Sequence, residues 1–171
     1  MTVAVKTGVW QLEQTASTVA VRHKTIWNLV TVNGTFTAIS GEGEVLPDGT
    51  ARGTVTLDAA SLDTKHSKRD QHLRSADFFD AERNPTITFE VRRAVPGSGD
   101  TVEITGQLTV RGISRPQSVT ATVTESGPDA ITLTAEFIVD RAQFDMTWNQ
   151  LGMMRGLTTV TSTLRFVRTG G

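Results

Sequence analysis

Residues 63–90 read DTKHSKRDQHLRSADFFDAERNPTITFE, and here the alternation of threonine and valine that fills most of the chain stops. A dense charged run, residues 65–74, comes first, and two adjacent phenylalanines at 78–79 follow it. Such a run can form a short helix with one polar side, while the two aromatic rings can cover an apolar surface. We therefore expect one helical insertion within residues 64–79, set between strands as a lid over a hollow interior.

Residues at the two ends of this insertion indicate where helical structure begins and ends. Asp63 or Thr64 can cap the helix, because a side-chain oxygen there accepts a hydrogen bond from the free amides of the first turn. Ser75 can cap a second turn in the same way. Pro85 pushes Asn84 out of helical geometry, so we expect the chain to leave the insertion in an extended conformation.

Alternation with period two, filled by β-branched residues, predicts strands on both sides of the insertion. The expected strands cover residues 9–13, 18–25, 31–45, 50–58, 86–94, 102–110, 119–123, 131–139 and 160–166. The longest of them keeps its register only if a bulge or bend intervenes, and Arg115-Pro116 is expected to break the chain before residue 119. Eight or nine antiparallel strands joined by short turns indicate a sandwich or a barrel, and barrel closure leaves no apolar edge exposed.

Length and composition argue against several classes of function. With 171 residues and no linker or repeat, residues 1–171 are expected to form a single domain. A net charge of −1 argues against binding to nucleic acid, and the absence of cysteine excludes disulfides and thiol chemistry. The chain has no apolar run near the roughly 20 residues of a membrane-spanning helix, so no stable membrane insertion is expected. The first ten residues lack the apolar core of a secretory signal, which predicts a cytoplasmic protein.

Three separated blocks of the sequence match a known signature. The first block comprises ASLDT at 60–64, KRDQHLRSADFFD at 68–80 and NPTITF at 84–89, and it is followed by GQLTVRGISRP at 106–116 and DRAQFDMTW at 140–148. These blocks resemble the YceI-like family of lipocalin-like polyisoprenoid-binding proteins, over residues 10–166. The resemblance implies an all-β fold, an antiparallel eight-stranded lipocalin-like barrel with a short helical insertion. It also places Asn33-Gly34 inside a strand, although that pair is otherwise a strong hairpin signal.

The interior of such a barrel could be packed or hollow. A barrel of about eight strands can hold one small ligand. Small residues stand at inward positions where a solid core would carry leucine, namely Gly34, Ala51, Gly53, Gly106, Ala121 and Ala135. The residues alone fit either interior equally well, and the resemblance favours a cavity.

The resemblance and the apolar residues together predict a ligand-binding wall for an isoprenoid or fatty-acyl lipid. Aromatic rings supply apolar area, and methionine side chains adapt to the shape of a flexible ligand. His23 alternates with Val19 and Val21, so it is expected to point inward and could contact a ligand head group. The predicted ligand-binding residues are Trp27, Phe36, Phe78, Phe79, Phe89, Leu108, Ala135, Phe137, Phe144, Trp148, Met153, Met154 and His23.

No catalytic residue, metal site or cofactor is predicted. His66 and Asp70 are one helical turn apart and could share a metal with His72 or His23, but a solvated helix face is the preferred interpretation. Arg69, Asp70 and His72 are expected to tie the helix to the barrel wall. The sequence GSG at 97–99 is not a five-residue nucleophile elbow. Glu42 and Glu44, each beside a glycine, are expected to mark a solvent-facing bend.

Three functions therefore remain open. The first is a barrel that sequesters or carries a long apolar ligand. The second is an enzyme acting on a lipid or quinone head group through His23 and the Arg69-Asp70-His72 cluster. The third is a packed barrel that serves as a protein-interaction module, including a homodimer formed through an exposed strand.

Overall fold

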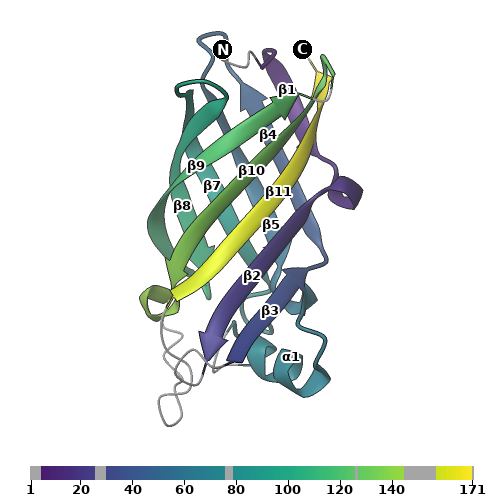
Figure 1. Cartoon of the computed structure of the whole chain (residues 1–171), viewed down its shortest axis with the longest axis vertical. Coiled ribbons are helices and arrows are strands. Elements are labelled where there is room, and N and C mark those ends of the chain that lie inside the picture. Colours follow the sequence, from purple (N-terminus) through teal and green to yellow (C-terminus); the bar gives the residue numbers. More distant parts are fainter. Residues whose placement is uncertain (1–4, 26–29, 76–78, 126, 145–156, 171) are drawn as a thin grey trace.

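The computed structural model describes residues 5–25, 30–75, 79–125, 127–144 and 157–170. In these residues one antiparallel sheet closes on itself as a barrel (Figure 1). The strands are β1 (Gly8–Leu12), β2 (Thr18–Thr25), β3 (Val30–Phe36), β4 (Ile39–Val45), β5 (Ala51–Asp58), β6 (Leu62–Asp63), β7 (Thr86–Pro96), β8 (Thr101–Val110), β9 (Ile113–Glu125), β10 (Ala130–Asp140) and β11 (Leu157–Gly170). They are ordered β1-β4-β5-β7-β8-β9-β10-β11, with β1 pairing with β11 to close the ring, and β2, β3 and β6 continue beyond β11.

The described strand segments form an eight-stranded barrel because three of its strands are interrupted. The 3-10 turn Gln14–Ala16 separates β1 from β2, and a second one, Ala59–Ser61, separates β5 from β6. Thr37 and Ala38 separate β3 from β4. The side-chain Oε1 of Gln14 accepts a hydrogen bond from the amide of Ile39 at 3.2 Å, beside this last break. The predicted eight-stranded antiparallel barrel is confirmed.

The long strand expected over residues 31–45 is bent, as its register required. Asn33 and Gly34 lie inside β3, where Gly34 pairs with Val21 of β2. A side chain at Gly34 would not fit, because a Cβ atom there would lie 2.8 Å from Cδ1 of Leu62 and 3.0 Å from Cγ2 of Thr64. The glycine therefore serves the close approach of the β6 segment and not a hairpin turn.

The predicted break at Arg115-Pro116 is wrong, since β9 already begins at Ile113. The turn between β8 and β9 is at Arg111-Gly112, whose φ angles are both positive, 55° and 74°, as in the two-residue turns that match strand twist. Pro116 is tolerated because β9 is paired with β10 only at residues 121–125 within the described chain. On its other side Pro116 pairs with Gln107 of β8. Because β9 has a strand partner on only one side at this position, a residue without an N–H group is tolerated there.

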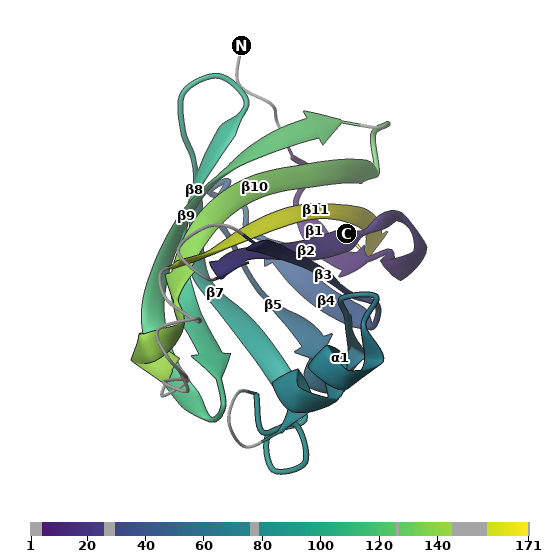
Figure 2. The same cartoon turned by 60° about the horizontal axis from the view of Figure 1, so that its bottom comes forward.

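The helical insertion is α1 (Ser67–Arg74), which lies at one end of the barrel beside β3 (Figure 2). The predicted N-cap is wrong, because Nδ1 of His66 accepts the hydrogen bond from the Arg69 amide, at 3.2 Å. Asp63 instead accepts from the amide of Lys65 at 2.9 Å. Ser75 is the C-cap residue of α1, and its hydroxyl donates to the carbonyl of His72. The second turn expected after Ser75 would involve residues 76–78, which lie outside the described residues. Of the helices the structure describes, none is long and apolar enough to cross a membrane.

A buried polar network ties α1 to the chain that precedes it, which agrees with the role expected for Arg69 and Asp70. Thr64 and Asp70 are both buried, and Oδ1 of Asp70 accepts from the Thr64 amide at 3.0 Å and from the Thr64 hydroxyl. Arg69 donates from Nε to the Thr64 hydroxyl and from Nη2 to the Thr64 carbonyl, both at 2.8 Å. The main-chain and side-chain groups of Thr64 are thereby paired without water, which fixes the start of the helix.

Buried apolar side chains gather at the two ends of the barrel. The cluster near the N- and C-terminal end contains Trp10, Val45, Val123, Ile131 and Phe166. The cluster near α1 contains Val19, Phe36, Ile39, Ala59, Leu62, Ile87, Leu108, Val110, Val139 and Phe144. Leu12, Val55 and Leu164 pack against both clusters, so the two clusters adjoin inside the barrel.

Replacing Asp70 with alanine should destabilise the fold by about 1–3 kcal/mol, because the Thr64 amide would be left buried without its acceptor. For a chain of this size the midpoint of thermal unfolding should fall by roughly 2–4 °C per kcal/mol. Denaturant unfolding followed by circular dichroism measures the change. The matched control is Gln71→Ala, an exposed position of the same helix that should change stability by less than about 0.5 kcal/mol. Equal stabilities of the two variants would show that the network does not hold the helix.

Candidate functional site

Two cavities lie inside the barrel. The first, which we call the Trp10 chamber, has a volume of about 150 Å³ and reaches the buried indole of Trp10. The second, the Phe36 chamber, also has a volume of about 150 Å³ and lies toward α1. The two chambers share five of their lining residues, Val55, Phe89, Phe137, Ser162 and Leu164. The two chambers are therefore neighbours, one bounded by the cluster that contains Trp10 and the other by the cluster near α1.

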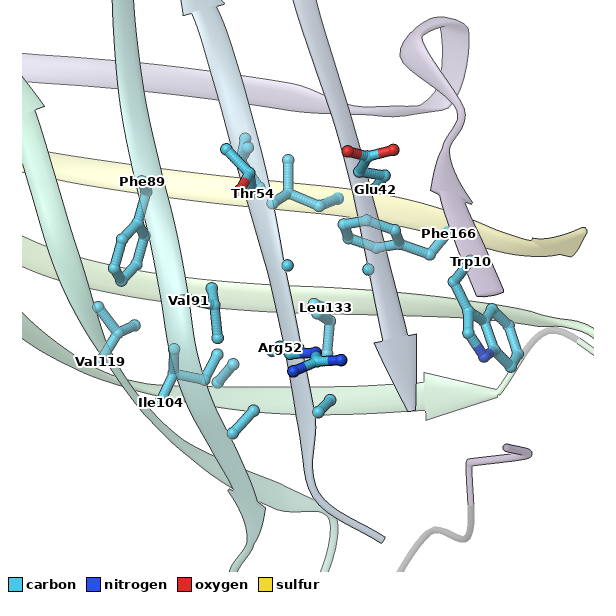
Figure 3. A pocket seen from close by; sticks show the side chains of 18 of the residues that line it. Trp10, Glu42, Arg52, Thr54, Phe89, Val91, Ile104, Val119, Leu133 and Phe166 are labelled. Atoms are coloured by element: carbon cyan, nitrogen blue, oxygen red, sulfur yellow. The ribbon is translucent and has the colours of Figure 1, made fainter. Parts of the chain in front are cut away.

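The Trp10 chamber has an apolar wall contributed by strands from around the barrel. Figure 3 shows Phe89, Val91, Ile104, Val119, Leu133 and Phe166 on this wall. Trp10 closes the end of the chamber, with 3% of its surface exposed. Its Nε1–H donates to the carbonyl of Lys6 at 3.0 Å, so the one polar atom of the indole is already paired outside the chamber.

One side of the Trp10 chamber is lined by backbone. Gly43 of β4 pairs with Gly53 of β5, and both face inward. A Cβ atom at Gly53 would lie 2.8 Å from the Cα of Gly43, so the two strands approach too closely for a side chain. The neighbouring residues alternate outward, where Arg52 and Glu44 form an ion pair of 3.0 Å. Glu42 is exposed and Glu44 half-buried, and both, with Arg52 and Thr54, also border the chamber where this wall is thin. The bend expected at Glu42 and Glu44 is absent, because β4 pairs with β5 continuously through them.

The small inward residues divide into two groups. Ala51, Ala121 and Ala135 line the Trp10 chamber, where their small side chains leave space, and Gly53 lines it with backbone. Gly34 and Gly106 do not. A Cβ atom at Gly106 would lie 2.6 Å from Cε1 of Phe89, so the aromatic ring already covers this glycine. The expectation that Gly106 opens the interior is wrong, because its space is filled from the neighbouring strand.

The Phe36 chamber is bounded by aromatic and aliphatic side chains. Phe36 of β3 and Phe79, from the segment that follows α1, meet edge to face with ring centres 6.1 Å apart and planes at 71°. Both line the chamber, as do Leu108 and Val139. The helical insertion thus contributes an aromatic ring to the chamber wall through the residue Phe79.

The polar side chains of the Phe36 chamber lie on one strand. Thr158 and Ser162, both on β11, line the Phe36 chamber. His23 of β2 is the direct cross-strand partner of Thr158, and it is buried, with 8% of its surface exposed. Its Nδ1 lies 2.9 Å from Oγ1 of Thr158. The hydroxyl of Ser162 donates a long bond of 3.4 Å to the carbonyl of Ala135.

The structure places the predicted ligand-binding residues in four groups. The first group, Phe36, Phe79 and Leu108, lines the Phe36 chamber, and the second group, Ala135, lines the Trp10 chamber. Phe89 and Phe137 belong to both of these groups, because they line both chambers.

The third group does not line either chamber. Phe144, with 1% of its surface exposed, belongs to the packed cluster near α1. His23 lies behind Thr158. The last group, Trp27, Phe78, Trp148, Met153 and Met154, lies outside the described residues.

Sequence reasoning did not single out Trp10, Thr158 or Ser162 as site residues. Trp10 and Ser162 were visible as members of inward-facing alternations, since Trp10 shares a strand face with Leu12 and Ser162 alternates with Val160 and Leu164. Thr158 extends the same alternation by one step. The signal that could have identified Thr158 and Ser162 is a polar residue at an inward position between aliphatic residues.

The described residues give no support to metal or acid–base chemistry at the chambers. No group of three His, Asp or Glu residues is arranged for a metal ion among them. His66 caps α1 and Asp70 holds Thr64, so this pair has structural roles. Two described carboxyl groups have a lowered pKa, and neither lines a chamber: Asp48 lies on the exposed turn between β4 and β5, and Asp63 lies at the end of β6. The Thr50 hydroxyl and amide lower the pKa of Asp48, and the Lys65 amide and side chain lower the pKa of Asp63.

Comparison with solved structures shows the same barrel in other bacteria. BcnA of Burkholderia cenocepacia superimposes with a TM-score of 0.82 at 22% identity, covering 90% of this chain and 98% of that one. A domain of Saccharophagus degradans, described as a polyisoprenoid binding domain implicated in plant cell wall breakdown, superimposes with a TM-score of 0.76 at 16% identity, covering 96% and 100%. At these identities the likeness concerns the fold.

Sequence comparison identifies the family. A UPF0312 protein of Pseudomonas aeruginosa is 44% identical over 75 residues, which are 44% of this chain and 39% of that relative. The aligned part thus spans about two fifths of the length of the relative. The family model for the YceI-like domain matches residues 10–166, which includes every barrel strand except the ends of the first and last. The chain belongs to the YceI-like domain family.

Proposed function

We propose that this barrel binds one long apolar molecule, an isoprenoid or fatty-acyl lipid, in its interior and thereby sequesters or carries it. The observation that carries the proposal is the pair of neighbouring apolar chambers inside the barrel. A relative of the same fold is described as a polyisoprenoid binding domain, which supports the ligand class. A cavity with an apolar wall and few polar groups is the usual form of a site for such ligands.

The energy of binding would come from removing apolar surface from water. Each methylene group transferred into the barrel contributes about 0.8 kcal/mol. A cavity of about 150 Å³ lined by aliphatic and aromatic side chains can hold a benzene molecule, so two such chambers in series hold about twelve carbon atoms. A longer isoprenoid would fill both chambers and extend beyond them.

The structure favours binding over the other two functions considered. An enzyme using the Arg69-Asp70-His72 cluster would need these side chains at the ligand, yet Arg69 and Asp70 are engaged with Thr64. A fully packed barrel would have no chamber in its middle. We therefore expect ligand retention without turnover.

The first test is to identify what the protein carries and how chain length matters. Extraction of the purified protein with organic solvent, followed by mass spectrometry, should release an apolar chain-like molecule. With the lipid removed, straight-chain alcohols should displace a fluorescent lipid with an affinity that rises about fourfold per methylene group. The rise should flatten near twelve carbon atoms, where the chambers are full. Affinity independent of chain length would rule out an interior site.

The second test fills the Trp10 chamber. Ala135→Phe should place an aromatic ring in the open space and weaken lipid binding at least tenfold, about 1.4 kcal/mol, with little change in stability. Ala20→Phe on β2, whose position alternates with the inward Val19 and Val21, is the matched control and should leave binding unchanged. If the interior were packed, Ala135→Phe would cost about 1–3 kcal/mol of stability in a protein that carries no lipid. Thermal unfolding and lipid retention, measured on both variants, separate the two results.

A further inference from the structure

The indole of Trp10 lies across one end of the barrel interior. Figure 3 shows it beside Phe166, at the edge of the side chains that line the Trp10 chamber. It belongs to the buried cluster that also contains Val45 and Ile131, and 3% of its surface is exposed. A chain-like molecule that filled the chamber in this direction would therefore meet an aromatic ring and not solvent.

This ring is held firmly on the wall. The backbone of Trp10 is paired on both sides, with Gly43 of β4 and with Arg168 of β11. Its Nε1–H donates to the carbonyl of Lys6 at 3.0 Å. A methionine side chain could adapt its shape to a ligand, whereas the indole would have to break this hydrogen bond in order to move aside.

Residues 5–7, which we call the N-terminal strap, are tied to the same end of the barrel. Nε of Arg168 donates to the carbonyl of Thr7 at 2.9 Å. Nζ of Lys6 lies 3.7 Å from Oδ1 of Asp129, and Nη1 of Arg168 lies 3.6 Å from the same oxygen. These charged side chains are partly exposed, so each ion pair contributes little by itself. Together with the bond to Thr7, they connect the strap to β11 and to the residue that precedes β10.

Packing alone does not account for a tryptophan at this position. Phe166 and Ile131 of the same cluster fill space without a polar atom that needs a partner. Trp10 brings an N–H group, and the strap supplies its acceptor from outside the chamber. Val5 of the strap also packs against the cluster. The indole is thus supported from behind, as a wall that stops a ligand has to be.

We propose that Trp10, with its ring held by the N-terminal strap, is the closed end of the ligand-binding interior and sets the length of apolar chain that the barrel can bury. This inference rests on the proposed interior binding and adds a residue that determines specificity for chain length. Below the limit, each methylene group raises the affinity about fourfold. Beyond the limit, further methylene groups stay outside the interior and contribute almost nothing.

Truncation of Trp10 tests this limit. Straight-chain alcohols of increasing length displace a fluorescent lipid from the delipidated full chain, and the limit is the length at which the affinity stops rising. Trp10→Ala should move the limit to chains longer by about four to eight carbon atoms, because the surrounding structure recovers only part of the removed volume. Trp10→Leu should move it in the same direction by less. Below the limit, the gain per methylene group should stay about fourfold.

Filling the same end should move the limit in the opposite direction. Ala51 lines the Trp10 chamber and packs against the cluster that contains Trp10. Ala51→Leu should shorten the limit by about three carbon atoms, the number that the larger side chain adds to this space. This variant leaves Trp10 in place, so with Trp10→Leu it keeps the test decisive if Trp10→Ala fails to fold.

The matched control is Phe144→Leu. Phe144 is also a large buried aromatic residue, with 1% of its surface exposed, but it lines neither chamber. The variant should lower the midpoint of thermal unfolding and leave the limit at its native value. A shift of the limit in this control would show that loss of stability alone moves it, which would overturn the assignment to Trp10.

The outcomes separate this inference from the proposed function. If folded Trp10→Ala or Trp10→Leu binds the alcohols with an unchanged limit, Trp10 is not the closed end while interior binding stands. If the affinity of the native protein rises with chain length without any limit, the interior has no closed end and this inference alone fails. If no alcohol displaces the fluorescent lipid, the proposed function fails and this inference fails with it.

Discussion

The barrel depends on the pairing of β11 along both of its edges. Residues 157–167 of this strand pair with β10 on one side, while on the other side its first half pairs with β2 and its second half with β1. This arrangement closes the sheet and removes the unpaired edges that would otherwise expose backbone groups. It also fixes which residues face inward, because a shift of one residue would turn Val160, Ser162 and Leu164 to solvent. The chambers exist only in this register.

The buried clusters that stabilise the barrel also border its chambers. Trp10, Val45, Ile131 and Phe166 of one cluster line the Trp10 chamber, and most of the cluster near α1 lines the Phe36 chamber together with partly buried side chains. Gly53 and Gly106 stand next to register shifts in the β5–β7 and β7–β8 pairs, where a Cβ atom would collide with the neighbouring strand. These glycines allow the strands to bend around the interior. Space inside the barrel comes from alanine and the Gly43–Gly53 wall, whereas Gly106 provides curvature.

Much of the fold was readable from local patterns, since period-two alternation and the single charged insertion predict the strands, the barrel and α1. The wrong predictions concern residues whose local structure depends on contacts with residues distant in the sequence. Thr64 has a good capping side chain, yet Asp70 and Arg69 occupy it, and His66 takes the cap. Pro116 looked like a strand end, but β9 lacks a second partner there and tolerates it. Which inward glycine opens space could not be predicted, because the ring of Phe89 covers Gly106 from another strand.

The buried polar groups of this barrel show why the interior walls matter for function. Around Thr64 every strong donor meets an acceptor of the protein itself, so that network has nothing to offer a ligand and can be understood as structure. The Thr158 hydroxyl differs, because it stands on the wall of an apolar chamber and has hydrogen-bonding capacity beyond its contact with His23. If the barrel binds a chain-like molecule as proposed, apolar contact would supply the affinity, which would then depend on the length of the apolar chain.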